Sequence, residues 1–278
     1  MSDALLRTAW RARLALQYTL DGARCVLSRR QHEGPLAVQK SLYPEGSGIC
    51  HNFILHPPAG MAGGDELDID VQLHKDAHVV LSTPGAGKWY RSAGDFARQR
   101  LRFRLERHAM LEWLPQESIF YSGAHANLRT RIDLQAGATY LGWDITCLGR
   151  PASGESFAKG EMRQHTELYI DNRLRWNEQA GVRGDDPLLG SAIGMKGFSI
   201  SATLLAAGRE ASPDILGALR SLSNPDCVLA VTAMQEFVLL RQLSHSAQQT
   251  RECFARARAL LRPWLCGIAD QPLRIWRT

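Results

Sequence analysis

The sequence lacks the features that mark several large classes of protein. No run of residues approaches the ~20 consecutive apolar residues that a membrane-spanning helix needs. The N-terminal stretch, MSDALLRTAWRARLALQ, places arginines where a signal peptide has an unbroken apolar block. The six cysteines lie far apart and form no C-x-x-C pair, so buried reduced thiols are expected rather than a zinc site or a disulfide framework. We therefore expect a cytoplasmic protein that does not enter the membrane.

Motifs for nucleophilic catalysis and nucleotide binding are also missing. The chain contains no G-x-S-x-G, which leaves a serine hydrolase poorly supported. Gly85–Lys88 resembles the end of a phosphate-binding loop, but Ser82 and Trp89 stand where that motif requires Gly and Ser or Thr. His74 and His78 are four residues apart across a polar turn rather than on a helix, a placement that does not chelate a metal.

Charge is present in modest excess and is spread along the chain. The 278 residues carry a net charge of +5, and 45% of them are hydrophobic, which is ample for a core. Many arginines alternate with apolar residues, as in the stretch 98–107, and this period of two is typical of a solvated sheet face. The pattern argues against a nucleic-acid groove and is compatible with an acidic protein partner.

Three consecutive units repeat the same pattern of alternating strand, polar turn and second strand. Their second strands begin at Ala77, Ala109 and Ala138, so the units are offset by 32 and 29 residues. We predict that each unit is a β-hairpin, and because a hairpin cannot bury its own face, the units should stack into a solenoid-like or sandwich-like body.

The segments around these units predict further strands and a change to helical spacing. Residues 11–30 predict a strand, turn and strand, and residues 161–178 predict a fourth hairpin that turns at Asp171-Asn172. Ser212-Pro213 should start one helix and Ser246 a second, which Pro263 should limit. The predicted fold is mainly β, with stacked hairpins and a few α-helices chiefly in the C-terminal part. We expect one domain over 1–278, comprising a β-rich body at 12–206 and a mixed helix and strand part at 207–278.

Several of the predicted strands end in polar segments that a plain core would not require. If the units stack, the side chains at equivalent ends would converge; these are Asp65, Lys88, Arg91, Glu117, Asp144, Arg150 and Glu155. Three interpretations stay open, namely a network of ion pairs, a hydrolytic acid and base pair, and a polar conduit for a hard cation. For Asp65 in particular, the Gly- and Pro-rich segment before it favours a tight turn in which the carboxylate bonds its own backbone.

The polar segments also carry a family resemblance. His56-Pro-Pro-Ala-Gly-Met-Ala-Gly-Gly-Asp65, Thr83-Pro-Gly-Ala-Gly-Lys-Trp-Tyr-Arg-Ser92, Glu112-Trp-Leu-Pro-Gln-Glu117, Leu148-Gly-Arg-Pro-Ala-Ser-Gly-Glu155 and the terminal Arg-Ile-Trp-Arg-Thr278 resemble segments of the urease accessory protein UreD, also called UreH. The likeness extends in order from about residue 14 to the C-terminus. It departs from the family pattern at Ala59, where Gly is usual, and at Trp89, where Phe is usual.

This resemblance implies a non-enzymatic urease maturation factor with a β-rich scaffold. Its partners would be UreF directly, the GTPase UreG through UreF, and apo-urease, with no cofactor stably bound and nickel in transit through a polar channel. The carboxylates proposed to line that channel are Asp65 and Asp144 first, then Glu66, Glu117, Glu155 and Glu178, because hard oxygen ligands hold a divalent ion loosely. Supporting residues would be His56, Lys88, Tyr90, Arg91 and Arg150.

The C-terminal helix and tail are the predicted contact for UreF. An amphipathic helix with exposed aromatic residues is a common interface, and the candidates are Phe254, Leu261, Trp264, Ile275 and Trp276. A carboxylate-based hydrolase in a β-solenoid remains the second hypothesis, and turnover of a substrate by the purified protein would distinguish it from a scaffold.

Overall fold

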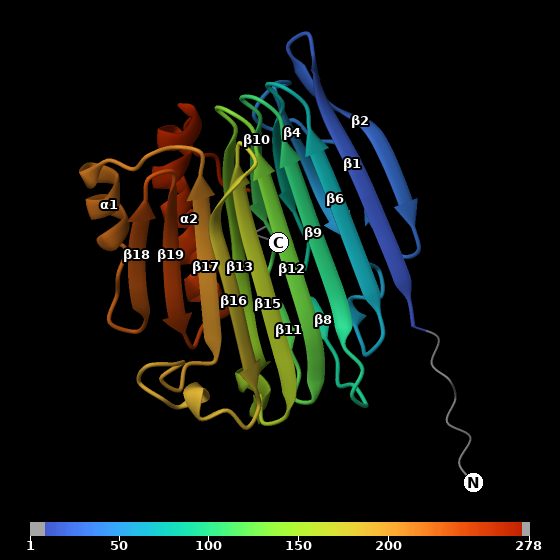
Figure 1. The fold of residues 1–278 in the computed structure, drawn as a ribbon, viewed down its shortest axis with the longest axis vertical. Helices are drawn as coiled ribbons and strands as arrows, with labels where there is room; N and C mark the ends of the chain where they lie inside the picture. The colour runs from blue at the N-terminus through green and yellow to red at the C-terminus, as the bar shows by residue number, and fades with distance from the viewer. Residues whose placement is uncertain (1–8, 274–278) are drawn as a thin grey trace.

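The computed structural model describes residues 9–273, which form two facing β-sheets with helices on one side (Figure 1). Sheet A has seven strands in the order β16-β15-β12-β9-β6-β1-β2, and sheet C follows the path β18-β19-β17-β13-β10-β7-β4-β3. The strands of sheet A are β1 (Arg11–Asp21), β2 (Arg24–Glu33), β6 (Glu66–Leu73), β9 (Ala97–Leu105), β12 (Ala124–Leu134), β15 (Gly160–Ile170) and β16 (Arg173–Arg183).

The strands on the sheet C path are β3 (Ala37–Val38), β4 (Ile49–Leu55), β7 (His78–Ser82), β10 (Met110–Leu114), β13 (Thr139–Arg150), β17 (Ile200–Ala207), β18 (Val228–Met234) and β19 (Phe237–Ser244). Four short strands pair beside this path, β5 (Gly60–Met61), β8 (Gly87–Trp89), β11 (Ser118–Phe120) and β14 (Glu155–Ser156). The helices are α1 (Pro213–Arg220) and α2 (Ala247–Cys266), with 3-10 turns at Pro151–Ser153 and Pro187–Leu189.

The three repeating units form a β-solenoid, but none of them is a hairpin. The first strand of each unit (β6, β9, β12) lies in sheet A and the second (β7, β10, β13) lies in sheet C, and successive units pair in parallel. Met110 lies opposite His78 on one side and Thr139 on the other, which confirms the predicted offsets of 32 and 29 residues. The hairpin prediction for these units was wrong because strand alternation is the same whether the second strand pairs with the first or crosses to the facing sheet.

The turn of each unit carries the chain from one sheet to the other. Asp76, His108 and Gly137 adopt positive φ values of 61°, 60° and 72° at these points. A Cβ on Gly137 would lie 2.4 Å from Nδ1 of His108, so the stacked turns leave no room for a side chain there. The turns therefore fix the stacking distance between units as well as the change of direction.

The two flanking pairs are true hairpins, as predicted. β1 pairs antiparallel with β2, and β15 pairs antiparallel with β16 through Asp171 and Asn172, whose φ values are 49° and 59°. Two positive φ values in a two-residue turn are typical of the tight turns that close β-hairpins.

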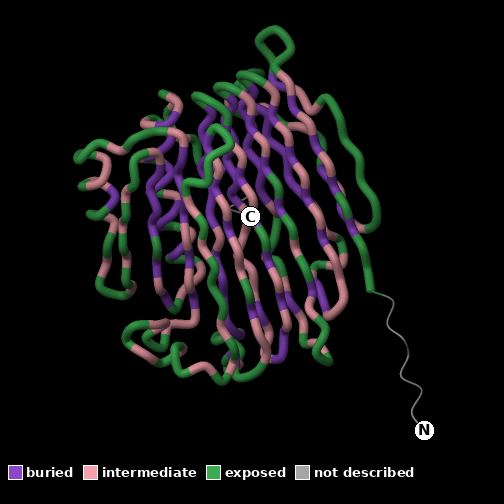
Figure 2. The backbone as a smooth tube through the Cα atoms, viewed as in Figure 1, coloured by how far each residue is buried: buried purple, intermediate pink, exposed green. Residues whose placement is uncertain are grey.

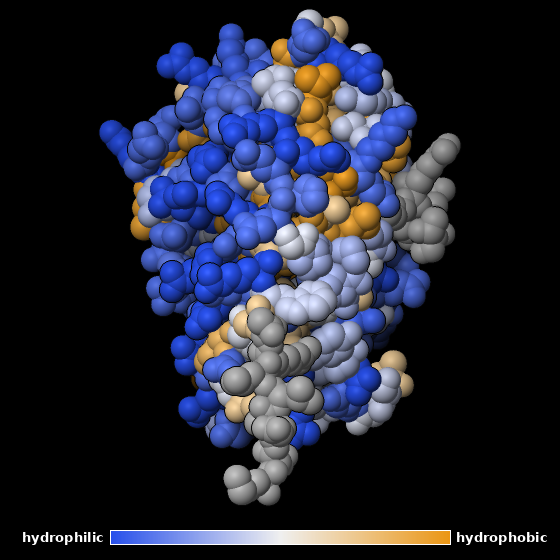
Figure 3. Space-filling model, turned by 90° about the vertical axis from the view of Figure 1, so that its right-hand side faces the viewer, coloured by the Kyte–Doolittle hydropathy of each residue, from blue (hydrophilic) through white to orange (hydrophobic). Residues whose placement is uncertain are grey.

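Alternation along the strands produces the main core between the sheets (Figure 2). In β6 every second residue is buried, from Leu67 to Leu73, and these side chains meet those of sheet C across the interior. A second core lies on the opposite face of sheet C, where α2 covers β13, β17 and β19 and α1 packs against α2 and β18. The side of the molecule formed by β1 and β2 is mainly hydrophilic, with hydrophobic residues gathered in a narrow band (Figure 3).

The C-terminal helices begin where the sequence predicts. Ser212 accepts a hydrogen bond from the backbone N–H of Ile215, and Ser246 accepts one from that of Gln249 at 3.2 Å. Pro263 does not limit α2, which continues to Cys266 and ends at Gly267 with a φ of 72°. Neither helix in the described part of the chain is long and apolar enough to cross a membrane.

Candidate functional site

Within residues 9–273, two open cavities flank β13, and one acidic residue lines both. The first cavity, of about 290 Å³, lies between β13, β15 and β17, and the second, of about 410 Å³, lies under the Gly- and Pro-rich segments 56–61 and 83–89. Asp144, on β13, lines both of them. The alternation of β13 places Asp144 on the interior face together with Tyr140 and Gly142, so the sheet directs its carboxylate between the two layers.

Asp144 is a half-buried carboxylate between the two sheets with little compensation. Gln164 on β15 reaches across from sheet A and donates a hydrogen bond from its Nε2 to Oδ2 of Asp144 at 3.3 Å. Burial raises the pKa of Asp144 to about 6, because few groups around the carboxylate stabilise its charge. Burial, followed by the nearby Asp144 charge, also raises the pKa of Tyr140. The carboxylate of Asp144 therefore titrates close to neutral pH and faces the space of both cavities.

The first cavity is lined by oxygen-bearing side chains. Glu178 lies on its wall and forms an ion pair with Arg241. The neutral oxygen donors around it are Thr130, Thr146, Thr166, Ser201, Thr203 and the amide of Gln164. Carboxylate, hydroxyl and amide oxygens are the ligands that hard or hydrated divalent cations accept.

The second cavity is lined by the backbone of the Gly- and Pro-rich segments 56–61 and 83–89 and by aromatic side chains. Lys88 lines it, and so does Trp113, whose buried Nε1 has no hydrogen-bond partner in the described part of the chain. Trp89 stacks on Phe120 with ring centroids 5.3 Å apart and closes one side. Gly60 approaches the ring of Tyr90 so closely that a Cβ there would lie 2.2 Å from it, which explains a glycine at this point. The stretch Gly87–Trp89 is strand, not a phosphate-binding loop.

Asp65 lies beside the second cavity, but its carboxylate is already hydrogen-bonded to backbone N–H groups. Its carboxylate accepts hydrogen bonds from the N–H groups of Trp10 at 3.0 Å and Ala62 at 2.8 Å, which is the tight-turn arrangement. Asp65 and Glu66 border a small hollow together with His56, and His56 also lines the second cavity. Burial lowers the pKa of His56, with the Asp65 charge opposing it, so this imidazole is neutral at pH 7.

Glu66 lies on the outer side of sheet A. Its carboxylate lies 3.6 Å from guanidinium nitrogens of Arg98 and of Arg100. Glu66 is thus part of the surface charge pattern of this sheet, and it touches the interior only through the small hollow it shares with Asp65.

The other predicted carboxylates and basic residues do not converge on the cavities. Glu117 forms an ion pair with Arg251 of α2. Glu155 pairs with Arg150 and accepts the N–H of Ser122 at 3.1 Å. The Arg150 guanidinium also lies over the ring of Tyr121, 4.4 Å from its centroid. These contacts place the two carboxylates in local ion pairs.

Two more of the predicted supporting residues, Tyr90 and Arg91, lie close to the segment 121–124. The ring of Tyr90 meets that of Tyr121 edge to face at 5.2 Å, and Arg91 is exposed and bridges to Ala124. Arg91 therefore does not line either cavity.

The predicted partner-binding residues of α2 need correction. Phe254 and Leu261 are fully buried and pack against sheet C, so neither is available to a partner. Trp264 is half-buried against the same core. Periodicity identified the apolar stripe correctly but could not tell whether it faced the protein's own sheet or another molecule. Ile275 and Trp276 lie outside the described residues.

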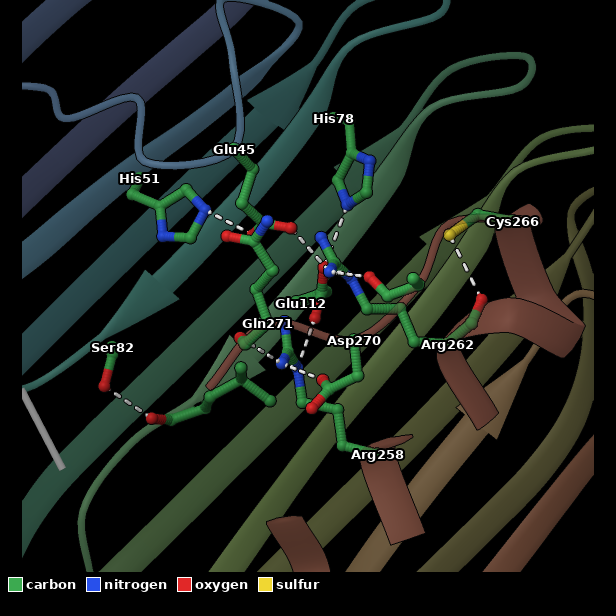
Figure 4. Close-up of polar contacts among 12 residues, drawn as sticks. Glu45, His51, His78, Ser82, Glu112, Arg258, Arg262, Cys266, Asp270 and Gln271 are labelled. Carbon is green, nitrogen blue, oxygen red and sulfur yellow. Dashed lines mark hydrogen bonds and ion pairs between the residues drawn. The ribbon is translucent and has the colours of Figure 1, made fainter. Parts of the chain in front are cut away.

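A buried cluster of ion pairs that the sequence analysis missed lies under α2 on the outer face of sheet C (Figure 4). Glu112 of β10, 0% exposed, accepts from Nε of Arg258 at 2.6 Å and from Nε of Arg262 at 2.9 Å. Nε2 of His78 lies 2.9 Å from the same carboxylate. Burial favours a raised pKa for Glu112, but the hydrogen bond with His78 and the two arginine charges hold it well below its usual value.

The cluster continues to the N-terminal and C-terminal parts of the chain. Nη1 of Arg262 donates to Glu45 at 2.6 Å, and His51 contacts Glu45 at 2.9 Å. Arg258 pairs with Asp270 and donates to the backbone oxygen of Gln271 at 3.0 Å. One signal was present in the sequence: Glu112 interrupts an apolar strand, and two arginines four residues apart fall on the apolar stripe of α2.

Comparison with known proteins decides the family. A family model described as UreD urease accessory protein matches residues 11–277. The chain belongs to the UreD family. A relative named urease accessory protein UreD from Pseudomonas savastanoi pv. phaseolicola is 44% identical over 278 residues, covering 100% of this chain and 98% of the relative. Relatives with the same name from Dechloromonas aromatica (43%, 97% of this chain and 95% of the relative) and Methylobacillus flagellatus (40%, 100% of both) match over similar lengths.

Membership of the UreD family gives the chain an accessory role in making urease. The predicted fold class and the resemblance that the sequence carries are both confirmed. Within residues 9–273, no group of three or more His, Cys, Asp and Glu side chains is placed to hold a metal ion.

Proposed function

We propose that this UreD protein is a non-enzymatic urease maturation factor that conveys nickel through its interior toward apo-urease. The single observation that supports the proposal is the position of Asp144, which lines both cavities and so offers one carboxylate to each. The second cavity and the hollow beside Asp65 also share wall residues, namely His56, Gly60, Met61 and Leu67.

The chemistry of the lining supports transit rather than storage. Asp144 supplies negative charge, Glu178 is paired with Arg241 on the same wall, and threonine, serine and glutamine oxygens lie among apolar side chains around them. A site of this kind attracts a divalent cation but holds it loosely, whereas a cage of cysteine and histidine side chains would retain nickel. Asp144 and Glu178 are accordingly the preferred conduit residues, and no stably bound cofactor is required.

The proposed partners are UreF directly, UreG through UreF, and apo-urease, all in the cytoplasm. Because the apolar stripe of α2 faces sheet C, UreF would have to contact the outward side of this helix. That side carries Glu252, Arg256 and Ala259, all exposed. The C-terminal tail that follows Asp270 completes the proposed contact.

The test compares residues of the cavity wall with a matched carboxylate outside it. Asp144→Ala and Glu178→Gln should each lower nickel content and activity of urease matured in a cell that depends on this chain, while UreF still co-purifies. Glu155→Gln removes a carboxylate from a half-exposed ion pair and should leave maturation unchanged. Normal nickel content in both cavity variants would refute the conduit, and turnover of a substrate by the chain alone would refute the non-enzymatic role.

A further inference from the structure

The outer face of sheet A is uncovered in the described part of the chain, in contrast to the outer face of sheet C. Both helices lie over sheet C, and no helix lies over sheet A in Figure 1. The exposed side chains of sheet A form rows across the parallel strands β6, β9, β12 and β15, because these strands pair in continuous register. The face is thus an ordered charge pattern with nothing from this chain above it.

The outward-facing charges of β9 are complementary to those of the neighbouring strand β6. This strand presents Arg98, Arg100, Arg102 and Arg104 to the outside. On the neighbouring strand β6, Asp68 lies 3.0 Å from Arg100 and Asp70 lies 2.6 Å from Arg104. Opposite charges in register between neighbouring strands stabilise the pairing, so this half of the face satisfies itself.

The other side of β9 is not complementary. Arg100 lies directly opposite Arg129 of β12, and Arg102 lies directly opposite Arg131. Arg131 is held by Asp133 at 2.8 Å and lies over the ring of Tyr169, 4.1 Å from its centroid. Like charges in direct opposition destabilise a sheet. We call these four residues, Arg100, Arg102, Arg129 and Arg131, the arginine patch.

Two members of the arginine patch form no ion pair within residues 9–273, namely Arg102 and Arg129, and both are exposed. Arg102 lies opposite Asp70 in register, but the carboxylate of Asp70 is paired with Arg104. Their positions are diagonal across β9 and β12, so the uncompensated charge is concentrated at one place rather than spread over the face. A surface that only needed to stay solvated would lose nothing by having a neutral residue at either position.

We propose that the arginine patch is a docking surface for an acidic protein face, and that this face belongs to apo-urease. The choice of apo-urease rests on the proposed function. Arginine binds carboxylates through two parallel hydrogen bonds, which suits recognition of aspartate and glutamate side chains on a folded partner. The acidic row of β6 beside the patch adds orientation, because it would pair with basic residues of the same partner and repel a wrongly placed acidic one.

A nucleic acid fits this face less well. A phosphate backbone crossing the arginine patch would run onto Asp68 and Asp70 on one side and onto Asp133 and Glu167 on the other. The net charge of +5 for the chain is also small for a protein that binds by neutralising many phosphates. Charge complementarity therefore favours a protein partner.

The test measures binding of the chain, in its complex with UreF, to immobilised apo-urease. Arg102→Ala/Arg129→Ala should weaken binding at least about tenfold, and the wild-type affinity should fall as salt is raised, since the contact is electrostatic. Arg29→Ala/Arg30→Ala is the matched control, because both arginines are exposed on β2 away from the patch and form no ion pair within residues 9–273; its affinity should equal that of the wild type. The thermal midpoint of the patch variant should not fall, because it relieves like-charge opposition.

The outcomes separate this inference from the proposed function. Equal binding of apo-urease by the patch variant and the wild type would overturn the docking surface and leave the conduit intact. Failure of the wild type to bind apo-urease would overturn both. Binding of duplex DNA that the patch variant loses, with binding of apo-urease retained, would assign the patch to nucleic acid instead.

Discussion

The cluster under α2 and the wall of the cavities both bury acidic side chains, and they treat them in opposite ways. Glu112 has two arginines and a histidine within 3 Å. Asp144 has one amide at 3.3 Å and open space on two sides. The pKa of the first is held well below its usual value and that of the second rises to about 6. A carboxylate with several charged partners from its own chain stabilises the fold, whereas a carboxylate with a single hydrogen bond can still bind a cation that enters the cavity.

The largest effect on stability should come from breaking the buried ion-pair cluster around Glu112. Glu112→Gln keeps the size of the side chain but removes the one carboxylate that Arg258 and Arg262 share, which leaves Arg258 with Asp270 and Arg262 with Glu45 alone, so we expect the free energy of unfolding to fall by about 3–5 kcal/mol. Urea denaturation measures it. Glu155→Gln, which removes a half-exposed ion pair, should cost less than about 1 kcal/mol. A similar small loss for both variants would mean that the buried cluster contributes no more than a surface pair.

Asp144→Asn should change stability in the opposite direction. At pH 7.5 the wild-type carboxylate is mostly ionised although burial disfavours the charge, so the neutral variant should be as stable as the wild type or more stable, by up to about 2 kcal/mol. The same urea denaturation applies. A loss of several kcal/mol would show that Asp144 is a structural residue like Glu112, and the contrast between the two regions would disappear.

The pH dependence should separate the two regions further. Because the pKa of Asp144 is raised by folding, the folded state gains relative stability from this group as pH falls from about 6 toward 4, and the advantage of Asp144→Asn should shrink over that interval. Glu112 and Glu45 have lowered pKa values, so their contribution is present above about pH 4.5 and is lost as pH falls below it. Denaturation midpoints of the wild type, Asp144→Asn and Glu112→Gln between pH 3 and 8 measure this. An Asp144→Asn curve parallel to the wild type between pH 4 and 6, or a Glu112→Gln curve parallel to it below pH 4.5, would contradict it.

The smallest effect on stability is expected for Arg241→Met. This change removes the counter-ion of Glu178 at the cavity wall, and the half-exposed pair should be worth less than about 1 kcal/mol. The freed carboxylate should bind a divalent cation more tightly, with an affinity for Ni²⁺ that rises severalfold in isothermal titration. Glu178→Gln combined with Arg241→Met is the control and should abolish that gain. An unchanged affinity in the single variant would place Glu178 outside the cation path.

The sequence predicted the solenoid body and named Asp144 among its candidates, but it did not reveal the contacts that join distant segments. The marker alanines gave the offsets between units because stacking in register repeats the same positions. Asp144 and Asp65 were both identified because they lie in polar segments at the ends of the units and in motifs of the family resemblance. Asp65 is held by two backbone N–H groups, and only its hydrogen bonds distinguish it from Asp144. The partners of Glu112 lie 146 and 150 residues away, which no local pattern can reveal.

The link between Glu45 and Arg262 spans 217 residues, and this has a consequence for how the protein is made. While the chain is still being synthesised, Glu45 and Glu112 have emerged but the arginines that neutralise them have not. The outer face of sheet C would then be an uncovered apolar surface carrying two acids whose contacts are His51 and His78 but not yet the arginines. This face is therefore covered and its charges balanced only when the last helix is added, so a chain cut short before α2 leaves both tasks undone.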